Sequence, residues 1–188
     1  MAIADTTPLS KREYKVITVP GGIFKLSETI VIPENFCLVL QQNTQLNFTL
    51  TSGNCIEMRG SATLEGHHAI IRVYKNFTGN VISIDTSKDG VIHASIPPYA
   101  KADPMWKRAR YITDINIVKT DPSTGFNSSI DGTDIGGIGL FISANFNTKE
   151  DYDGVNTAPI AFIWGMTCTG IRISGAFECG IKIINTDQ

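Results

Sequence analysis

The stretch VITVPGGIFKLSETIVIPENFCLVLQQNTQL, residues 16–46, decides the fold of this 188-residue chain. It divides into short apolar runs rich in Ile and Val, and the runs are separated by Gly, Pro, Asn and Ser. Branched apolar residues favour strands, and the residues between them favour turns. Similar runs continue through residues 55–85 and 112–185. The only helix signal is Pro8 after a possible Thr7 N-cap, so we expect an all-β chain with at most a short N-terminal helix.

Three features of these runs favour a solenoid over a sandwich or barrel. Isoleucines recur at Ile115, Ile138, Ile160 and Ile181, in steps of 23, 22 and 21 residues, and such periods are typical of stacked repeats. Earlier steps are looser, with 22 residues from Val16 to Leu38 and 18 from Leu38 to Ile56. Tight hairpin turns between adjacent runs are nearly missing. Many runs are also apolar-x-apolar units, which place two side chains on one face of a strand.

The sequence therefore predicts a parallel β-helix of about seven coils. Residues 1–14 form a lead or cap segment, and residues 15–188 form the β-helix domain. Residues 94–110 interrupt the rhythm with three prolines and are expected to form a loop insertion between coils. Residues 121–136 and 147–159 also read as loops, and insertions on a solenoid are common binding sites.

The composition excludes several classes of function. The net charge is −2 and no long run of like charge occurs, which argues against nucleic acid or an anionic membrane as a partner. No apolar run approaches the roughly 18 residues that span a bilayer, so we expect no membrane insertion. The four cysteines do not have zinc-site spacing and are expected to be buried, reduced thiols. We expect no cofactor and no metal.

The opening stretch resembles the first coils of bacteriophage tailspike and capsule-depolymerase β-helices, and of pectate-lyase-like proteins more widely. The segments that carry the resemblance are Val19-Pro20-Gly21-Gly22-Ile23-Phe24, Leu26-Ser27-Glu28-Thr29-Ile30 and Ile32-Pro33-Glu34-Asn35-Phe36-Cys37-Leu38. The resemblance implies a right-handed parallel β-helix in a homotrimeric spike of the virion tail. Such a spike binds a bacterial surface polysaccharide, either capsule or O-antigen, and often cleaves it.

Two departures from that family concern the ends of the chain. No virion-attachment domain precedes Lys15, and the last residues, 183–188, continue an apolar coil. Because solenoids need a polar cap to stay soluble, we expect that this chain is a fragment or that a partner covers its end.

Candidate catalytic residues are sparse. Glycoside cleavage uses two carboxylates, and outward-facing acids are few in this chain. They are Glu57, Glu65, Asp114 and Glu178, and each can also be interpreted as an ordinary solvated surface carboxylate. We expect Glu178 and Glu57 to be the best catalytic candidates.

Residues with other candidate roles lie elsewhere in the chain. Trp106, Lys107 and Arg108 are expected to bind substrate, because an aromatic ring packs on a sugar and cations pair with acidic sugars. The alternative is that Trp106 folds down and anchors its own loop. His67 and His68 are interpreted as a structural pair, one inward and one outward. The alternative function is a non-catalytic structural or adhesive module.

Overall fold

The computed structural model describes residues 15–85, 111–121, 135–143 and 166–184. Within these ranges all regular structure is β-strand, and two sheets of eight and five strands contain only parallel pairs. The prediction of an all-β chain is confirmed for these residues. The same residues contain no helix long and apolar enough to cross a membrane. The helix expected after Thr7 and the insertion 94–110 lie outside the described residues.

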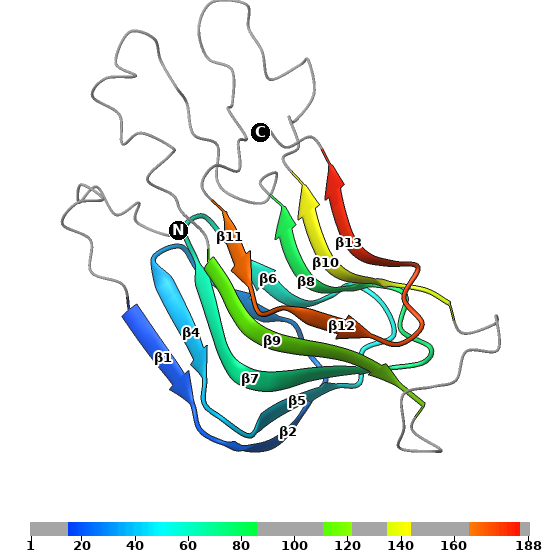
Figure 1. Cartoon of the computed structure of the whole chain (residues 1–188), viewed down its shortest axis with the longest axis horizontal. Coiled ribbons are helices and arrows are strands. Elements are labelled where there is room, and N and C mark those ends of the chain that lie inside the picture. Colours follow the sequence, from blue (N-terminus) through cyan, green and yellow to red (C-terminus); the bar gives the residue numbers. More distant parts are fainter. Residues whose placement is uncertain (1–14, 86–110, 122–134, 144–165, 185–188) are drawn as a thin grey trace, which may run out of the picture.

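The strands repeat in threes along the chain, and we call the three stacks of equivalent strands columns (Figure 1). The first column contains β1 (Lys15–Val19), β4 (Phe36–Leu40), the beginnings of β7 (Thr63–Tyr74) and β9 (Tyr111–Thr120), and β11 (Thr167–Thr169). The second column contains β2 (Gly22–Leu26), β5 (Thr44–Phe48), the remainders of β7 and β9, and β12 (Arg172–Ser174). The third column contains β3 (Ile30–Ile32), β6 (Asn54–Met58), β8 (Asn80–Asp85), β10 (Ile138–Ser143) and β13 (Cys179–Ile184).

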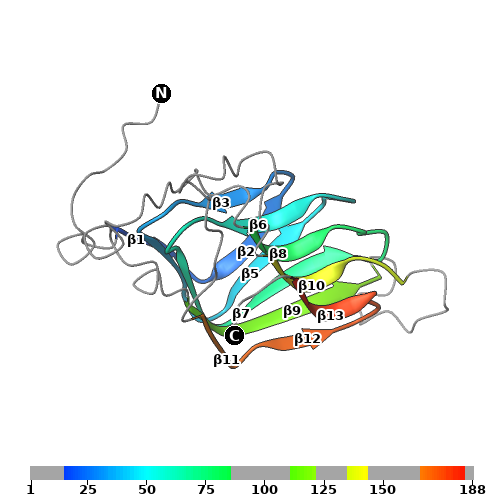
Figure 2. The same cartoon turned by 90° about the horizontal axis from the view of Figure 1, so that it is seen from above.

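One pass of the chain through the three columns makes one layer, and the described residues form five layers. Layers 1 and 2 are β1–β3 and β4–β6, layer 3 is β7 and β8, layer 4 is β9 and β10, and layer 5 is β11–β13. The view from above shows the third column as a staircase, β3 to β13 (Figure 2). The first two columns belong to one sheet because β7 and β9 run through both.

The register corrects the predicted spacing of the coils. Ile115 pairs with Ala69 in the second column, whereas Ile138 pairs with Asn80 in the third, so their 23-residue step does not separate stacked positions. Leu140 pairs with Ile181, a step of 41 residues. The second half has long steps because residues 86–110, 122–134 and 144–165 come between described strands. Two of these segments, 86–110 and 144–165, are about as long as a coil, so an estimate from chain length gives seven coils where the described residues form five layers.

The earlier steps were also misaligned. Val16 pairs with Cys37 rather than with Leu38. Leu38 pairs with Leu64, 26 residues on, and not with Ile56, which lies in another column. Every run has the same alternating apolar pattern. The pattern alone therefore does not show to which column a run belongs.

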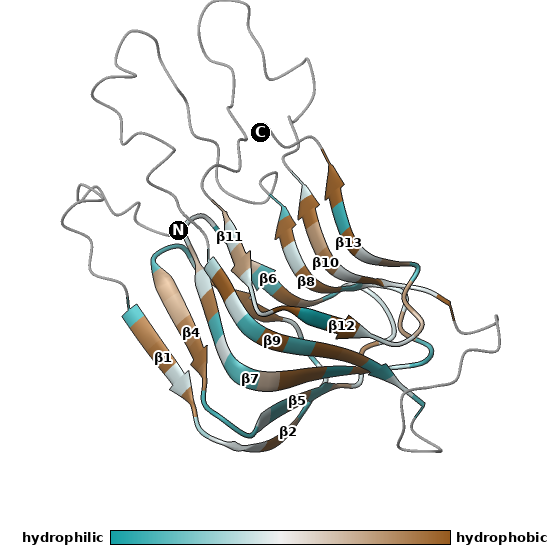
Figure 3. Cartoon of the chain, viewed as in Figure 1, coloured by the Kyte–Doolittle hydropathy of each residue, from teal (hydrophilic) through white to brown (hydrophobic). Residues whose placement is uncertain are grey.

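The core fills the space between the columns, and alternation along each strand supplies it. Ile71 and Val73 are fully buried in β7, and polar and apolar residues alternate along β7 and β9 (Figure 3). In layer 5 the same alternation leaves Ile181 and Ile183 50% and 58% exposed. Cys168, stacked on the buried Ile112, is exposed too, and Cys179 is only partly buried, so the expectation of four buried thiols holds for Cys37 and Cys55 and is wrong for the other two. The inward positions of layer 5 are uncovered because no further layer stacks on them within the described residues.

A buried lysine ties three layers together at the corner between the second and third columns. The Nζ atom of Lys119 donates hydrogen bonds to the carbonyl oxygens of Phe77 (3.0 Å), Gly136 (2.7 Å) and Ala176 (3.1 Å). These carbonyls belong to layers 3, 4 and 5. A buried ammonium group is tolerated only when it is hydrogen-bonded. Lys119 therefore holds the backbone at this corner in position in each of the three layers.

Candidate functional site

The corner between the first and second columns has an unusual backbone. The corner has three residues in layer 2 (Gln41–Asn43) and in layer 3 (Gly66–His68), but one in layer 4 (Asp114). The non-glycine residues with positive φ at this corner are Asn43 (65°), His67 (41°), His68 (65°) and Asp114 (51°). A non-glycine residue in this conformation is uncommon and costs free energy, and such residues cluster at functional sites. These four residues therefore mark the corner as a candidate functional site.

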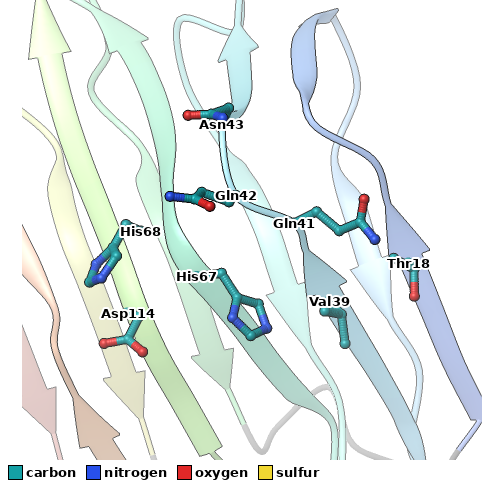
Figure 4. A pocket seen from close by; sticks show the side chains of 8 residues that line it. All are labelled: Thr18, Val39, Gln41, Gln42, Asn43, His67, His68 and Asp114. Atoms are coloured by element: carbon teal, nitrogen blue, oxygen red, sulfur yellow. The ribbon is translucent and has the colours of Figure 1, made fainter.

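A groove with a volume of about 760 Å³ opens on the outer surface at this corner. It reaches across strands β1, β4, β7 and β9 (Figure 4). Three amides, two imidazoles, one carboxylate and one hydroxyl line it, together with a single apolar side chain. Its lining residues are Thr18, Val39, Gln41, Gln42, Asn43, His67, His68 and Asp114. Such groups combine hydrogen-bond donors and acceptors, so the groove suits a ligand that is rich in hydroxyl groups.

His67 and His68 both face solvent, so the expectation of one inward and one outward imidazole is wrong. The pairing of β7 with β9 shifts register between Glu65 and Ala69, where three residues lie opposite one. This bulge breaks the alternation of a strand, which is why neither imidazole points into the core. The backbone of the bulge is held in place, because the Nδ2 atom of Asn116 donates a 2.9 Å hydrogen bond to the carbonyl oxygen of His68.

Two glycines allow Asp114 to sit at the corner. A β-carbon at Gly66 would overlap the side chain of Ile115 and the carbonyl oxygen of Asp114. A β-carbon at Gly170, in layer 5, would overlap the Asp114 carboxylate. Asp114 is thus packed between glycines of the layers on either side of it. The sequence placed it among ordinary surface acids, because nothing in the sequence pairs these two distant glycines with it.

Glu57, a predicted catalytic residue, is engaged in local contacts on the outside of the third column. Its carboxylate forms an ion pair with Arg59 and accepts a 2.7 Å hydrogen bond from the Nδ2 atom of Asn54. Asn54 in turn accepts a hydrogen bond from Asn80, 2.9 Å long. The side chain of Glu57 is 13% exposed. These contacts give Glu57 a structural role in joining layers 2 and 3.

Glu178 lies far from Glu57. It is exposed just before β13, and no ion pair joins it to Arg172 or Lys182, its expected neighbours, within the part of the chain that the structure describes. Strands β6 and β13 are separated by β8 and β10, so three strand spacings, about 14 Å, lie between them. Inverting glycosidases need carboxylates about 6.5–9.5 Å apart. The structure does not bring the two predicted carboxylates together.

The predicted substrate-binding residues Trp106, Lys107 and Arg108 lie outside the described residues. The described chain stops at Asp85 in the third column and resumes at Tyr111 in the first column. Among the described ranges, no group of three His, Cys, Asp or Glu side chains is placed to hold a metal ion.

The comparisons with known proteins give no further guide to function. No protein-family model matches the chain, and neither the curated proteins nor the solved structures contain a significant match to it. Because one fold carries many functions, the function has to be argued from the groove and its surroundings.

Proposed function

We propose that this chain is a right-handed parallel β-helix from a bacteriophage tailspike and that it binds a bacterial surface polysaccharide, capsule or O-antigen. Three columns of parallel strands with corners at equivalent positions support this fold. The motif from Val19 to Leu38 contributes to layers 1 and 2, where the resemblance to tailspikes would place it. In this proposal the spike is a homotrimer in the virion tail.

The observation that carries the proposal is the polar groove at the corner of the first two columns. It extends over four layers, which gives it the length to hold several sugars of a chain. Its amides, imidazoles and carboxylate offer hydrogen bonds to sugar hydroxyls from backbone positions that are held by neighbouring layers. An open groove admits a polymer from either end, whereas an enclosed pocket admits only a chain terminus.

Cleavage of the polysaccharide is assigned to the assembled spike rather than to the described residues. Glu57 is paired with Arg59, and Glu178 lies three strands away from it. These two observations favour the second candidate function, a non-catalytic structural or adhesive module, for the described part of the chain. In that case the chain binds glycan and releases no reducing ends.

A binding experiment tests the proposal. Purified chain is titrated with labelled capsule and O-antigen polysaccharides, and the dissociation constant is measured by biolayer interferometry. His68→Gly keeps the positive φ accessible while removing the imidazole, and Gln42→Ala removes an amide. We expect each to weaken binding about tenfold, the loss of roughly one hydrogen bond of about 1.4 kcal/mol. Lys182→Ala, on β13, is the control and retains wild-type affinity.

The outcomes separate the candidate functions. Binding without release of reducing ends or unsaturated uronates identifies an adhesive module, and release identifies a depolymerase. If no polysaccharide in the panel binds, the proposal is wrong.

A further inference from the structure

The outer face of the second column carries positive charge and no carboxylate; we call it the second-column face. Its charged side chains are Lys25 in β2, Arg72 in β7 and Arg172 in β12. Each points outward: Lys25 lies between Phe24 and Leu26, which pack against the core, and Arg72 between the buried Ile71 and Val73. Arg172 pairs with Asn116, which lies between the buried Ile115 and Ile117. No Asp or Glu occurs in the strand residues of this column, which are 22–26, 44–48, 69–74, 115–120 and 172–174.

These three cations are not paired with a carboxylate in the part of the chain that the structure describes. The Nε atom of Arg72 is buried and has no hydrogen-bond partner. A guanidinium stays charged at any physiological pH, and a buried donor without a partner costs free energy. An anionic ligand would pair with the outward-facing cations, and a carboxylate fits a guanidinium with two parallel hydrogen bonds.

Amide side chains lie beside these cations on the same face. Asn47 pairs in register with Arg72, and Asn116 pairs with Arg172. Gln45 donates a 2.8 Å hydrogen bond from its Nε2 atom to the Oδ1 atom of Asn47, which leaves the second amide proton and its own carbonyl oxygen for other partners. Cations that bind carboxylates and amides that bind hydroxyls therefore alternate along the stack.

The distances between neighbouring cations suit a polymer that has one negative charge in each repeat. Lys25 and Arg72 are separated by two strand steps, β2 to β5 to β7, which is about 10 Å. Arg172 lies two strand steps from β7, but it aligns through Asn116 with Ile70, so it is also displaced from Arg72 by two residues along the strand, and the two cations are about 12 Å apart. The face begins at the groove, because Asn116 bonds to the backbone of His68 in the groove wall. A ligand with one negative charge in each repeat could follow the stack from one cation to the next.

We propose that the ligand is an acidic polysaccharide, with a carboxylate-bearing sugar in its repeat, and that it runs from the groove along the second-column face. This inference rests on the proposed function and adds the substrate class to it. Lys25, Arg72 and Arg172 bind the carboxylates, and Gln45, Asn47 and Asn116 bind hydroxyls between them.

The test compares acidic polysaccharides with their carboxyl-reduced forms. The probes are acidic and neutral bacterial capsule and O-antigen polysaccharides, with each acidic member also presented after reduction of its carboxylates to alcohols. We expect the 188-residue chain to bind acidic members, and reduction to weaken binding at least tenfold. Arg72→Gln and Arg172→Gln should each weaken binding to the acidic form about tenfold and leave binding to the reduced form unchanged. Lys182→Gln, which removes the same charge from the third column, is the matched control.

Each alternative outcome is decisive. Equal affinity for native and reduced forms, or an equal loss in Lys182→Gln, overturns the acidic-ligand inference and leaves glycan binding in place. Absence of binding to every polysaccharide overturns the proposed function as well. Single-stranded DNA is included as a non-glycan polyanion, and equal affinity for it would make the face a general anion-binding surface. If Arg72→Gln fails to fold, the exposed Arg172→Gln carries the test alone.

Discussion

The buried thiol of Cys55 should make the folded protein less stable as the pH rises above 9. Burial raises the pKa of its thiol from 9.0 to about 12. Below pH 9 the thiol is protonated in both the folded and the unfolded chain, whereas between pH 9 and 12 only the unfolded chain ionises it. The free energy of unfolding should therefore fall by about 1.4 kcal/mol for each pH unit in this window.

Urea unfolding at pH 8 and pH 10 measures this effect. Cys55→Ala serves as the comparison, because tyrosines and lysines also titrate at high pH. Between the two pH values the wild type should lose about 1.4 kcal/mol more than Cys55→Ala. An equal loss in both proteins would show that the thiol is already accessible in the folded state.

The corner residues show the limit of prediction from sequence at this scale. Asp114, His67 and His68 are visible in the sequence, but their grouping depends on the register shift that places the His67–His68 bulge opposite Asp114. A register shift occurs where two neighbouring layers have different numbers of residues at a corner. No local sequence pattern encodes that number. The contacts of Glu57 show the same limit: its partner Arg59 is visible two residues on, but the hydrogen bond from Asn54 is not.

Single strands were predicted well, because alternation is a local property. The runs at 37–40, 55–58 and 81–85 correspond to β4 (36–40), β6 (54–58) and β8 (80–85). The spacing between layers was predicted poorly, because long segments between strands have no fixed length. The described strands on either side of these segments still pair in parallel register, so the pairing does not depend on a constant number of residues between strands.

Adjacent isoleucines in β7 test the alternation directly. Ile71 is fully buried in the core, whereas Ile70 lies on the second-column face and is partly exposed. Ile71→Ala should lower the free energy of unfolding by about 2–5 kcal/mol, because it leaves a cavity between stacked layers. Ile70→Ala should cost no more than about 1 kcal/mol. The two substitutions remove the same atoms one residue apart, so similar losses measured by urea unfolding would contradict the assignment of inward and outward faces.

At the scale of the whole molecule, the distribution of charge matters more than its sum. The chain has a net charge of −2, which suggested that no basic surface exists. Folding nevertheless separates the charges, because the second column contains Lys25, Arg72 and Arg172 and no acid. The cations occur only in every second layer, so the separation is invisible along the chain, where acids of other columns intervene.

The stack is also uneven along its length, and this predicts where it opens first. In a solenoid each layer contacts only the layers next to it, so an end layer has one stabilising neighbour and a middle layer has two. β8 in layer 3 has four buried residues, whereas none of the residues of β13 is buried. Hydrogen exchange followed by mass spectrometry should therefore show the slowest exchange in β7 and β8 and faster exchange in β1–β3 and β11–β13. If the amides of β11–β13 exchange as slowly as those of β7, then Ile181 and Ile183 are covered in solution by another copy or another segment. Repeating the exchange at tenfold dilution separates these two cases, because only a second copy dissociates on dilution.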